Sequence, residues 1–434
     1  MNTVQKTKIS PILKAFWGFS VAFLVMALLA SDRADMLTGL KNIIFYPSQV
    51  TTDYFVIGGV SATFLNVGLL GIVCCLLMSI PGYKIVGASG IAFFLTTGFA
   101  FFGMNVINVW PCLGGAFLYA LLHKKPMASV VNFGIFATGL SPFVSDMLWR
   151  YPGLEIHGFT LFGVCMALLI GGLFGYLTAA GCAHSPNVHK GFSIYSAALP
   201  IGMMGFLMRA ILYTSLGGEL DEMQAVLSDG YQVLCTAFCV VAFVLCIGYG
   251  YWVNGKSFQG LKEMLKDTGH KVDFTAKYGH GLSLISLGLF GLAAVAYYIA
   301  IGATWTGPTI GVVFCMISVG FAGAHLGNIW PVALGYVLAS LVSVYDLNAQ
   351  SIVVGLCFAM GIAPVAGVYG WVWGVIAGGL HSLLVTSVPA LYGGLCLYNG
   401  GFTVCLVVIV LVPILEHFAK TKAERLELKI AKTK

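Results

Sequence analysis

Long apolar runs recur along almost the whole chain, separated by short polar segments. Each run has about 18–25 residues, the length of an α-helix that crosses a hydrocarbon layer about 30 Å thick. Because lipid offers the backbone no hydrogen bonds, such segments are expected to be helices. The pattern predicts seven segments in each half of the chain: 12–30, 54–79, 84–101, 104–122, 127–146, 156–181 and 191–214, then 232–253, 281–301, 304–323, 326–344, 348–364, 366–386 and 393–415.

The composition agrees with this pattern. Of the 434 residues, 59% are hydrophobic and 9% are charged, and the mean hydropathy is +0.93. A soluble domain carries about a quarter charged residues, so these values exclude one large soluble core. The first apolar run follows Lys6, Lys8 and Lys14, as the apolar part of a cleaved signal peptide would. We favour a permanent span because the run has a counterpart in the second half.

Reactive chemistry is not indicated. The twelve cysteines lie mostly inside apolar runs and form no Cys-x-x-Cys pair, as expected for cysteine used as a small buried hydrophobic residue. No motif of a zinc protease, a serine hydrolase or a P-loop occurs. We therefore expect no cofactor, no metal and no catalytic residue. The net charge of +6 lies in loops and the tail without interleaved aromatic residues, so no nucleic-acid partner is expected.

The chain contains an internal repeat. Gly68–Leu121 aligns without a gap on Gly288–Leu341, at a constant offset of 220. Repeats of this size are typical of transporter folds. Further matching elements occur in the same order: Val21-Ala22-Phe23 with Val241-Ala242-Phe243, Gly39-Leu40-Lys41 with Gly260-Leu261-Lys262, Phe136-Ala137 with Phe358-Ala359, and Gly191-x-x-x-Tyr195 with Gly394-x-x-x-Tyr398.

An odd number of segments per half predicts that the second half is inverted relative to the first. Lysine and arginine favour the cytoplasmic side. With both termini cytoplasmic, the basic N-terminus, the loop at 123–125, the loop at 254–280 and the tail all fall inside, and the linker with Glu219, Asp221, Glu222 and Asp229 falls outside. We therefore predict a first repeat (1–216), an external acidic linker (217–231), a second repeat (232–418) and a charged cytoplasmic tail (419–434) that forms a short solvated helix.

The first repeated motif is Gly103-x-Asn105-x-x-Asn108-x-Trp110-Pro111, matched by Gly323-x-His325-x-x-Asn328-x-Trp330-Pro331. Glycine permits close backbone approach, proline removes a helix donor, and asparagine can both donate and accept hydrogen bonds. Asn105, Asn108, His325 and Asn328 are therefore candidates for solute binding. An alternative with no role for a solute is a helix cap beside an interfacial tryptophan.

The second motif is Gly139-Leu140-Ser141-Pro142, matched by Gly361-Ile362-Ala363-Pro364. It predicts a broken half-helix near the middle of the membrane, where transporters commonly build substrate sites, with Ser141 as a binding residue. An ordinary loop proline at the membrane surface is the alternative. The sequence leaves open whether these two segments span the membrane or re-enter it.

The third motif is Gly191-x-x-x-Tyr195-Ser196, matched by Gly394-x-x-x-Tyr398-Asn399. Its hydroxyl, amide and glycine groups suit a wall that hydrogen-bonds a small polar solute. Packing of helices through small residues uses the same residue types and is the alternative.

Ionisable residues inside the predicted spans are few, namely Asp146, Arg209, His325 and His381. No pair of buried carboxylates is expected to recur between the halves, since Asp146 aligns with Val368. Ion-coupled transport usually needs such a carboxylate. We therefore expect a transporter or channel that passes a neutral or weakly charged solute passively. The alternatives are a secondary active transporter for a small anion or a nucleobase-like solute, an intramembrane enzyme, and a scaffold or sensor.

The repeated Asn-x-x-Asn-x-Trp-Pro and Gly-x-x-x-Tyr-[Ser/Asn] elements resemble a prokaryotic family of multi-pass membrane proteins that is known as a domain of unknown function. The resemblance covers nearly the whole chain and implies location in the bacterial inner membrane. Gly394–Phe402 is also similar to the glycine-rich element of urea transporters, which are inverted-repeat facilitators. That similarity implies a central pore lined by Tyr195, Ser196, Tyr398 and Asn399, although Ser196 stands where the urea-transporter element has asparagine.

The inverted fold of nucleobase and anion transporters has the same number of segments. In that fold the N-termini of facing half-helices bind an anion through their dipoles. The expected partners are the lipid bilayer and a small-molecule solute, and a homo-oligomer is left open.

Overall fold

The computed structural model describes residues 9–221, 228 and 230–433, and over these residues the chain is helical without strands. The described helices include eight that are long and apolar enough to cross a membrane, and shorter apolar helices lie among them. The protein is therefore a multi-pass membrane protein in contact with lipid. The eight are Pro11–Leu29, Tyr54–Leu77, Leu161–Gly181, Ala198–Ser215, Gln232–Val253, Gly279–Ile301, Gln350–Tyr369 and Asn399–Leu428.

The elements of the first half follow the order of the predicted segments, with two additional short helices, α2 and α9. A 3₁₀ turn separates α6 from α7, and a π-helical turn, Ala210–Ser215, extends α10. The helices are α1 (Pro11–Leu29), α2 (Met36–Ile44), α3 (Tyr54–Leu77), α4 (Gly87–Phe99), α5 (Trp110–Leu122), α6 (Val131–Ala137), α7 (Ser141–Trp149), α8 (Leu161–Gly181), α9 (Ser185–Val188) and α10 (Ala198–Arg209).

The second half runs through a corresponding series. Its helices are α11 (Gln232–Val253), α12 (Leu261–Met264), α13 (Phe274–Lys277), α14 (Gly279–Ile301), α15 (Gly307–Ser318), α16 (Leu326–Ser340), α17 (Gln350–Ala359), α18 (Ala363–Tyr369), α19 (Trp371–Val385), α20 (Asn399–Phe418) and α21 (Lys422–Thr433). A glycine with positive φ occupies the aligned position near the start of α3 and at the start of α14. Gly59 kinks α3 at a φ of +82°, and the aligned Gly279, at +83°, separates α13 from α14.

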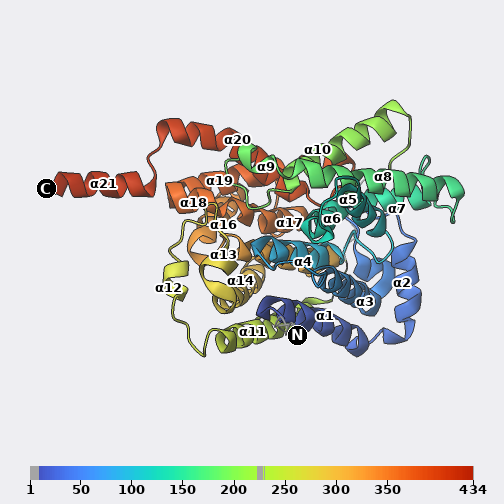
Figure 1. Cartoon of the computed structure of the whole chain (residues 1–434), viewed down its shortest axis with the longest axis horizontal. Coiled ribbons are helices and arrows are strands. Elements are labelled where there is room, and N and C mark those ends of the chain that lie inside the picture. Colours follow the sequence, from blue (N-terminus) through green and yellow to red (C-terminus); the bar gives the residue numbers. More distant parts are fainter. Residues whose placement is uncertain (1–8, 222–227, 229, 434) are drawn as a thin grey trace, which may run out of the picture.

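Helices of the two halves meet in the middle of the molecule, where α4 packs on α15, and diverge towards its sides. Figure 1 shows α1 beside α11 at one edge, α5 and α8 towards one side, and α16 and α19 towards the other. Glycines bring the outer pairs close together. A Cβ on Gly175 of α8 would lie 1.9 Å from the Cys112 carbonyl oxygen of α5, and one on Gly378 of α19 would lie 2.3 Å from the Val332 oxygen of α16. Such contacts let membrane helices pack backbone to backbone.

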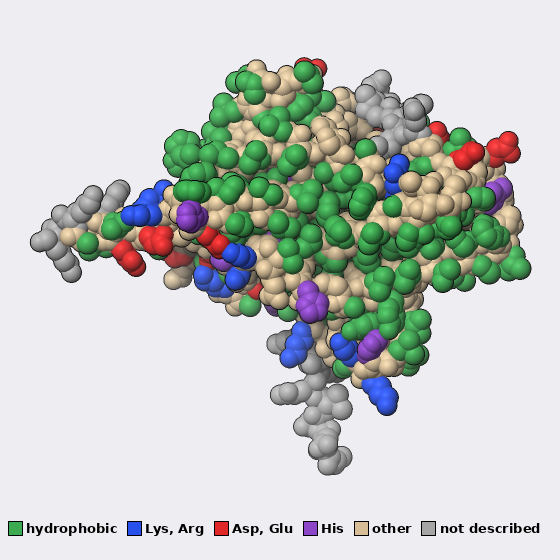
Figure 2. Space-filling model, turned by 90° about the horizontal axis from the view of Figure 1, so that it is seen from above, with side chains coloured by type: hydrophobic (Ala, Val, Ile, Leu, Met, Phe, Trp, Pro, Cys, Tyr) green, Lys and Arg blue, Asp and Glu red, His purple; other side chains and the backbone are tan. Residues whose placement is uncertain are grey.

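The surface of the bundle is largely apolar. In Figure 2 hydrophobic side chains cover most of the visible face, while charged side chains gather near its margins. Exposed leucines such as Leu161 on α8 and Leu245 on α11 face outward, whereas every residue of α15 and every residue of α4 except the half-buried Ala88 is buried. This distribution fits peripheral helices in lipid around a central α4–α15 pair.

Several predicted spans are shorter than expected. The segments 84–101 and 104–122 become α4 and α5, each of 13 residues, which is roughly 20 Å of helix. Turns occupy residues 100–109 because Asn105 and Asn108 bond to the backbone there. The tail forms the predicted exposed helix, α21. Lys6, Lys8, Glu222, Asp229 and Lys434 lie outside the described residues.

At each Gly-x-x-Pro motif a 3₁₀ turn, and not an extended loop, divides the segment into two short helices. Residues 131–149 remain helical through a single 3₁₀ turn, Thr138–Leu140, and 350–369 do the same through Met360–Ile362. Pro142 and Pro364 each stand at the start of the next helix. A missing N–H is tolerated in the first helical turn, because donors there have no partner in their own helix.

Candidate functional site

The two Gly-x-x-Pro turns each leave a backbone carbonyl available to another segment. In a 3₁₀ helix the carbonyl of residue i accepts from the N–H of residue i+3. For Gly139 that residue is Pro142 and for Gly361 it is Pro364, and proline has no N–H. The Gly139 oxygen instead accepts from the Leu397 N–H at 2.9 Å, and the Gly361 oxygen accepts from the Ile194 N–H at 3.1 Å. Each half therefore supplies the donor for the other half.

We call these two hydrogen bonds, Leu397 to Gly139 and Ile194 to Gly361, the crossed contact, and two tyrosines complete it. Tyr398 lies against Gly139, where an added Cβ would be 2.1 Å from its ring, and Tyr195 lies against Gly361, where it would be 2.5 Å away. The exposed fractions of Tyr195 and Tyr398 are 2% and 1%. The Tyr195 hydroxyl donates to the Cys315 carbonyl oxygen of α15 at 2.8 Å. The second and third motifs thus meet, but each glycine meets the tyrosine of the opposite half.

A loop covers each tyrosine segment. At one end the Val50 N–H donates to the Gly394 oxygen at 2.8 Å. At the other end His270 Nε2 lies 2.9 Å from the Lys190 oxygen, and its ring stacks on Phe192. We call the first the Arg150 end, which contains Gln49, Arg150, Asp221 and Gly393, and the second the Lys190 end, which contains Lys190, His270 and Glu416.

The asparagines of the first motif are engaged locally. Asn108 and Asn328 each accept from the backbone N–H three residues earlier, and each donates to the oxygen of the preceding glycine, Gly103 or Gly323, at 2.8–3.0 Å. Asn108 Nδ2 also donates to Ser145 Oγ of α7 at 2.9 Å. These contacts are those of a cap, the alternative that the sequence left open.

Asn105 and His325 take part in the same caps. Asn105 Oδ1 accepts from the N–H groups of Ile107 and Asn108, and His325 Nδ1 accepts from the Gly327 N–H at 3.1 Å. His325 Nε2 lies 2.9 Å from the Asp267 carbonyl oxygen. Because Nδ1 is an acceptor, Nε2 carries the proton and donates to that oxygen. The solute-binding role of these residues stays a prediction.

The remaining candidates lie beside the crossed contact. Ser141 is fully buried, and its hydroxyl has no hydrogen-bond partner among the described residues. Asn399 Oδ1 accepts from the Gly400 N–H at 2.5 Å. Ser196 Oγ lies 2.9 Å from His189 Nε2. Burial lowers the pKa of His189 to about 4, so this imidazole is neutral near pH 7.

The helix-breaking residues of the first motif serve close packing. A Cβ on Gly103 would meet the Leu397 side chain at 2.5 Å, and one on Gly323 would meet the Gly269 oxygen at 2.2 Å. Pro111 and Pro331 each pack against a glycine of the neighbouring helix, Gly171 of α8 or Gly374 of α19. These contacts lie at equivalent positions of the two halves.

One recurring carboxylate pair escaped the sequence analysis. Asp53 Oδ1 accepts from the Gly307 N–H at 2.9 Å, and Asp273 Oδ2 accepts from the Gly87 N–H at 2.8 Å. Both aspartates also cap their own helices, α3 and α13. A carboxylate therefore recurs at this position, but the two are not a pair of buried carboxylates, since Asp53 is buried and Asp273 is half-buried. Extending the offset of 220 by fifteen residues towards the N-terminus would have found it.

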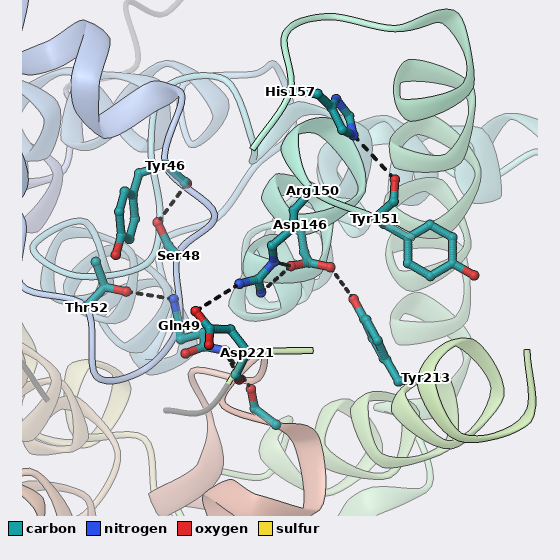
Figure 3. Close-up of polar contacts among 11 residues, drawn as sticks. Tyr46, Ser48, Gln49, Thr52, Asp146, Arg150, Tyr151, His157, Tyr213 and Asp221 are labelled. Atoms are coloured by element: carbon teal, nitrogen blue, oxygen red, sulfur yellow. Dashed lines mark hydrogen bonds and ion pairs between the residues drawn. The ribbon is translucent and has the colours of Figure 1, made fainter. Parts of the chain in front are cut away.

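A buried ion pair distinguishes the Arg150 end (Figure 3). Asp146 is fully buried; its Oδ1 lies 2.7 Å from Arg150 Nε, and its Oδ2 accepts from the Tyr213 hydroxyl at 2.5 Å. Arg150 Nη1 lies 3.7 Å from Oδ2 of Asp221 in the linker. Gln49 Nε2 donates to the carbonyl oxygens of Asp221 and Gly393 at 3.2 and 3.3 Å.

Comparison with known proteins identifies the family. The profile of DUF1576, described as a protein of unknown function, matches residues 32–214 and 253–417. The chain belongs to this family. Neither the search of curated proteins nor that of solved structures found a match.

The two matched segments of this DUF1576 protein correspond to its two halves. Each begins after the first apolar helix, α1 or α11, and each ends within or just after the last one, α10 or α20. The stretch between them contains the acidic linker and α11. The resemblance to a membrane family of unknown function, predicted from the repeated motifs, is thus confirmed.

Proposed function

We propose that this protein is a membrane carrier for a small polar solute, built from two inverted repeats of seven segments that interlock at the Gly–Tyr contacts. The observation that carries the proposal is the crossed exchange: Leu397 and Tyr398 dock on Gly139, and Ile194 and Tyr195 dock on Gly361. Transporters of inverted-repeat type place their solute site where the two repeats meet, near the middle of the membrane.

Reciprocity supports the repeat. Suppose that a residue of the first half contacts a residue of the second half. A two-fold relation between the halves then requires the counterpart of each residue to make the same contact with the roles of the halves exchanged. The Gly–Tyr contacts obey this rule, and so do the bonds of Asp53 to Gly307 and of Asp273 to Gly87. The double match of the family profile supports it as well.

The predicted topology follows from an odd number of segments per repeat. The basic loops favour cytoplasmic termini, which places the Lys190 end inside and the Arg150 end outside. Reporter fusions or cysteine labelling at the C-terminal tail test this orientation. An external C-terminus would contradict the fourteen-segment arrangement.

Closure at both ends favours a carrier over an open pore. A permanently open channel would expose the residues of its wall, whereas Tyr195 and Tyr398 are buried and each is covered by a loop of the opposite half. Transport would then require the two ends to open alternately. The crossed contacts are the positions at which the halves must part.

The solute is expected to be small, polar and neutral or weakly charged, and its passage passive. Amides and hydroxyls can replace water around a neutral solute at modest cost. Of the candidates, Ser141, Tyr398 and Asn399 lie nearest the crossed contact, and Asn108 and Asn328 hold the turns beside it.

Flux into proteoliposomes tests the proposal, with urea, glycerol and small amides as probes and with or without proton and sodium gradients. A carrier gives counterflow, meaning that solute preloaded inside accelerates uptake, whereas a channel does not. We expect Asn399→Ala and Tyr398→Phe to reduce flux without a matching loss of thermal stability. Asn348→Ala, on an exposed loop, is the control. Gradient-driven accumulation would overturn the passive mode.

A second candidate is a secondary active transporter for a small anion. The observation that favours it is the buried Asp146–Arg150 pair, because ionisable groups inside a membrane protein commonly mark the path of a charged solute or a coupling ion. Dependence of flux on a proton or sodium gradient would select this candidate.

A further inference from the structure

The guanidinium of Arg150 has two unlike neighbours. It follows α7, its side chain is only 5% exposed, and removing such a group from water is costly unless it is paired. One neighbour is Asp146, which is fully buried and held by the Tyr213 hydroxyl. This carboxylate is a fixed partner.

The other neighbour is loosely held. The carboxylate of Asp221 is 64% exposed, and its Oδ2 lies 3.7 Å from Arg150 Nη1, beyond the 2.7–2.9 Å of a direct charge-assisted hydrogen bond. An ion pair that is partly exposed to solvent contributes little. Arg150 thus directs towards the linker a nitrogen whose present partner, the exposed Asp221 carboxylate, is weakly held (Figure 3).

We propose that Arg150 binds the carboxylate of a small solute at this end, and that Asp221 occupies the position when no solute is bound. This inference deepens the second candidate function, a transporter for a small anion, by naming the solute class, and it rests on that function only for the step after binding. The exchange replaces one carboxylate by another and leaves the charge around Arg150 unchanged. A free carboxylate can approach the planar guanidinium in the two-pronged geometry that arginine favours.

Displacement of Asp221 would reach the crossed contact through Gln49. The Gln49 amide donates to both the Asp221 and the Gly393 oxygens. Gly393 begins the segment that leads to Tyr398 and its contact with Gly139. Withdrawal of Asp221 therefore removes one of the two bonds that hold Gln49 over this segment, and it couples recognition of the solute to the loop above Tyr398.

The aligned positions of the second half do not carry the counterparts of Asp146, Arg150 and Gln49. Val368 and Val372 align with Asp146 and Arg150, and Gly269 aligns with Gln49. Beside Val372 the nearby arginine is Arg425 of α21, which donates to the Tyr369 carbonyl oxygen. Among the described residues, a buried aspartate–arginine pair that faces a linker carboxylate therefore occurs at the Arg150 end and not at these aligned positions.

Thermal unfolding of the purified full-length protein in detergent tests the inference, with acetate and succinate as probes, phosphate as the competing oxyanion and chloride at matched ionic strength as the reference. We expect acetate and succinate to raise the melting temperature of the wild type. Asp221→Asn should lower the half-saturating concentration by up to about fivefold, because the competing carboxylate is gone. Glu219→Gln, an exposed acidic residue on the same linker, should leave it unchanged.

Variants of Arg150 complete the test. Arg150→Gln should abolish the carboxylate effect; if this variant does not fold, Arg150→Lys keeps the charge but loses the planar fork and should raise the half-saturating concentration at least tenfold. Equal responses of Asp221→Asn, Glu219→Gln and wild type would overturn the inference. So would a response to phosphate alone, or an undiminished response in Arg150→Lys. Carboxylate binding without any flux would refute the carrier function and support the Arg150 site. Counterflow of neutral solutes without carboxylate binding would support the carrier function and refute the site.

Discussion

The Arg150 end and the Lys190 end share the crossed backbone hydrogen bonds but differ in their covering contacts and in their charged side chains. At both, a loop of one half covers the tyrosine segment of the other, and that segment donates an N–H to a glycine oxygen freed by proline. The Arg150 end adds a buried ion pair, with side chains 5% and 0% exposed. The Lys190 end has the Lys190–Glu416 pair, whose side chains are 47% and 41% exposed.

The contacts shared by both ends are made by backbone, glycine and tyrosine, and they hold the halves together. The contacts that differ are made by charged side chains, and those at the Arg150 end are the ones that we propose to bind a solute carboxylate. Alternating access needs both features: equivalent closures on two sides, and a means of distinguishing the sides. The comparison therefore separates the contacts that join the two halves from the charged side chains that we propose to recognise the solute.

The largest stability effect is expected at Asp146. Asp146→Asn removes the fixed partner of a buried arginine, and breaking such a pair costs about 3–5 kcal/mol. Chemical or thermal unfolding in detergent measures the loss. The control is Glu219→Gln on the exposed linker. A loss below about 1 kcal/mol would mean that Arg150 is well solvated, and the contrast between the two ends would then disappear.

Next comes the crossed contact, where both ends should respond alike. Gly139→Ala and Gly361→Ala each push a Cβ into a tyrosine ring, at 2.1 and 2.5 Å, and should destabilise the protein by about 1–3 kcal/mol. Gly114→Ala is the matched control, since a Cβ there meets nothing within 4 Å. A second change, Tyr398→Ala, should reduce the stability loss caused by Gly139→Ala and leave the loss caused by Gly361→Ala unchanged. A reduction of both losses, or of neither, would contradict the crossed pairing.

The two aspartates that bind across the halves, Asp53 and Asp273, should differ in how much they contribute to the free energy of unfolding. Loss of a helix cap costs about 0.5–2 kcal/mol. Each aspartate also accepts from a hydroxyl at 2.6 Å, Asp53 from Ser228 Oγ and Asp273 from Thr275 Oγ1, but Asp53 is buried and Asp273 is half-buried. We therefore expect Asp53→Ala to cost more than Asp273→Ala in the same unfolding assay. Ser228→Ala should reduce the difference between them. A larger loss in Asp273→Ala would show that burial does not set the order.

The smallest effect is expected at the exposed pair of the Lys190 end. Glu416→Gln should change stability by less than about 1 kcal/mol, because such pairs are screened and cost side-chain entropy. Raising the salt concentration should remove what difference there is, while the Asp146→Asn effect should persist in salt. A large, salt-resistant loss in Glu416→Gln would make the two ends energetically alike.

Much of the architecture follows from the sequence. The length and spacing of apolar runs predict membrane helices, because an unpaired backbone is intolerable in lipid. The offset of 220 and the motifs Gly139–Pro142 and Gly191–Ser196, with their counterparts, predict which elements correspond. The charged tail predicts the exposed helix α21. All of these are local or periodic properties that a single chain carries in its order of residues.

The tertiary structure alone decided the partners. The sequence placed Asp146 near the end of a span, but only packing buries it and brings Tyr213 and Asp221 to its salt bridge. Likewise, nothing in the spacing of Gly139 and Pro142 reveals that the freed oxygen meets Leu397 rather than a residue of its own half. A hydrogen bond between segments more than 250 residues apart depends on how the helices cross, and crossing is set by the fit of many side chains at once, not by any motif read along the chain.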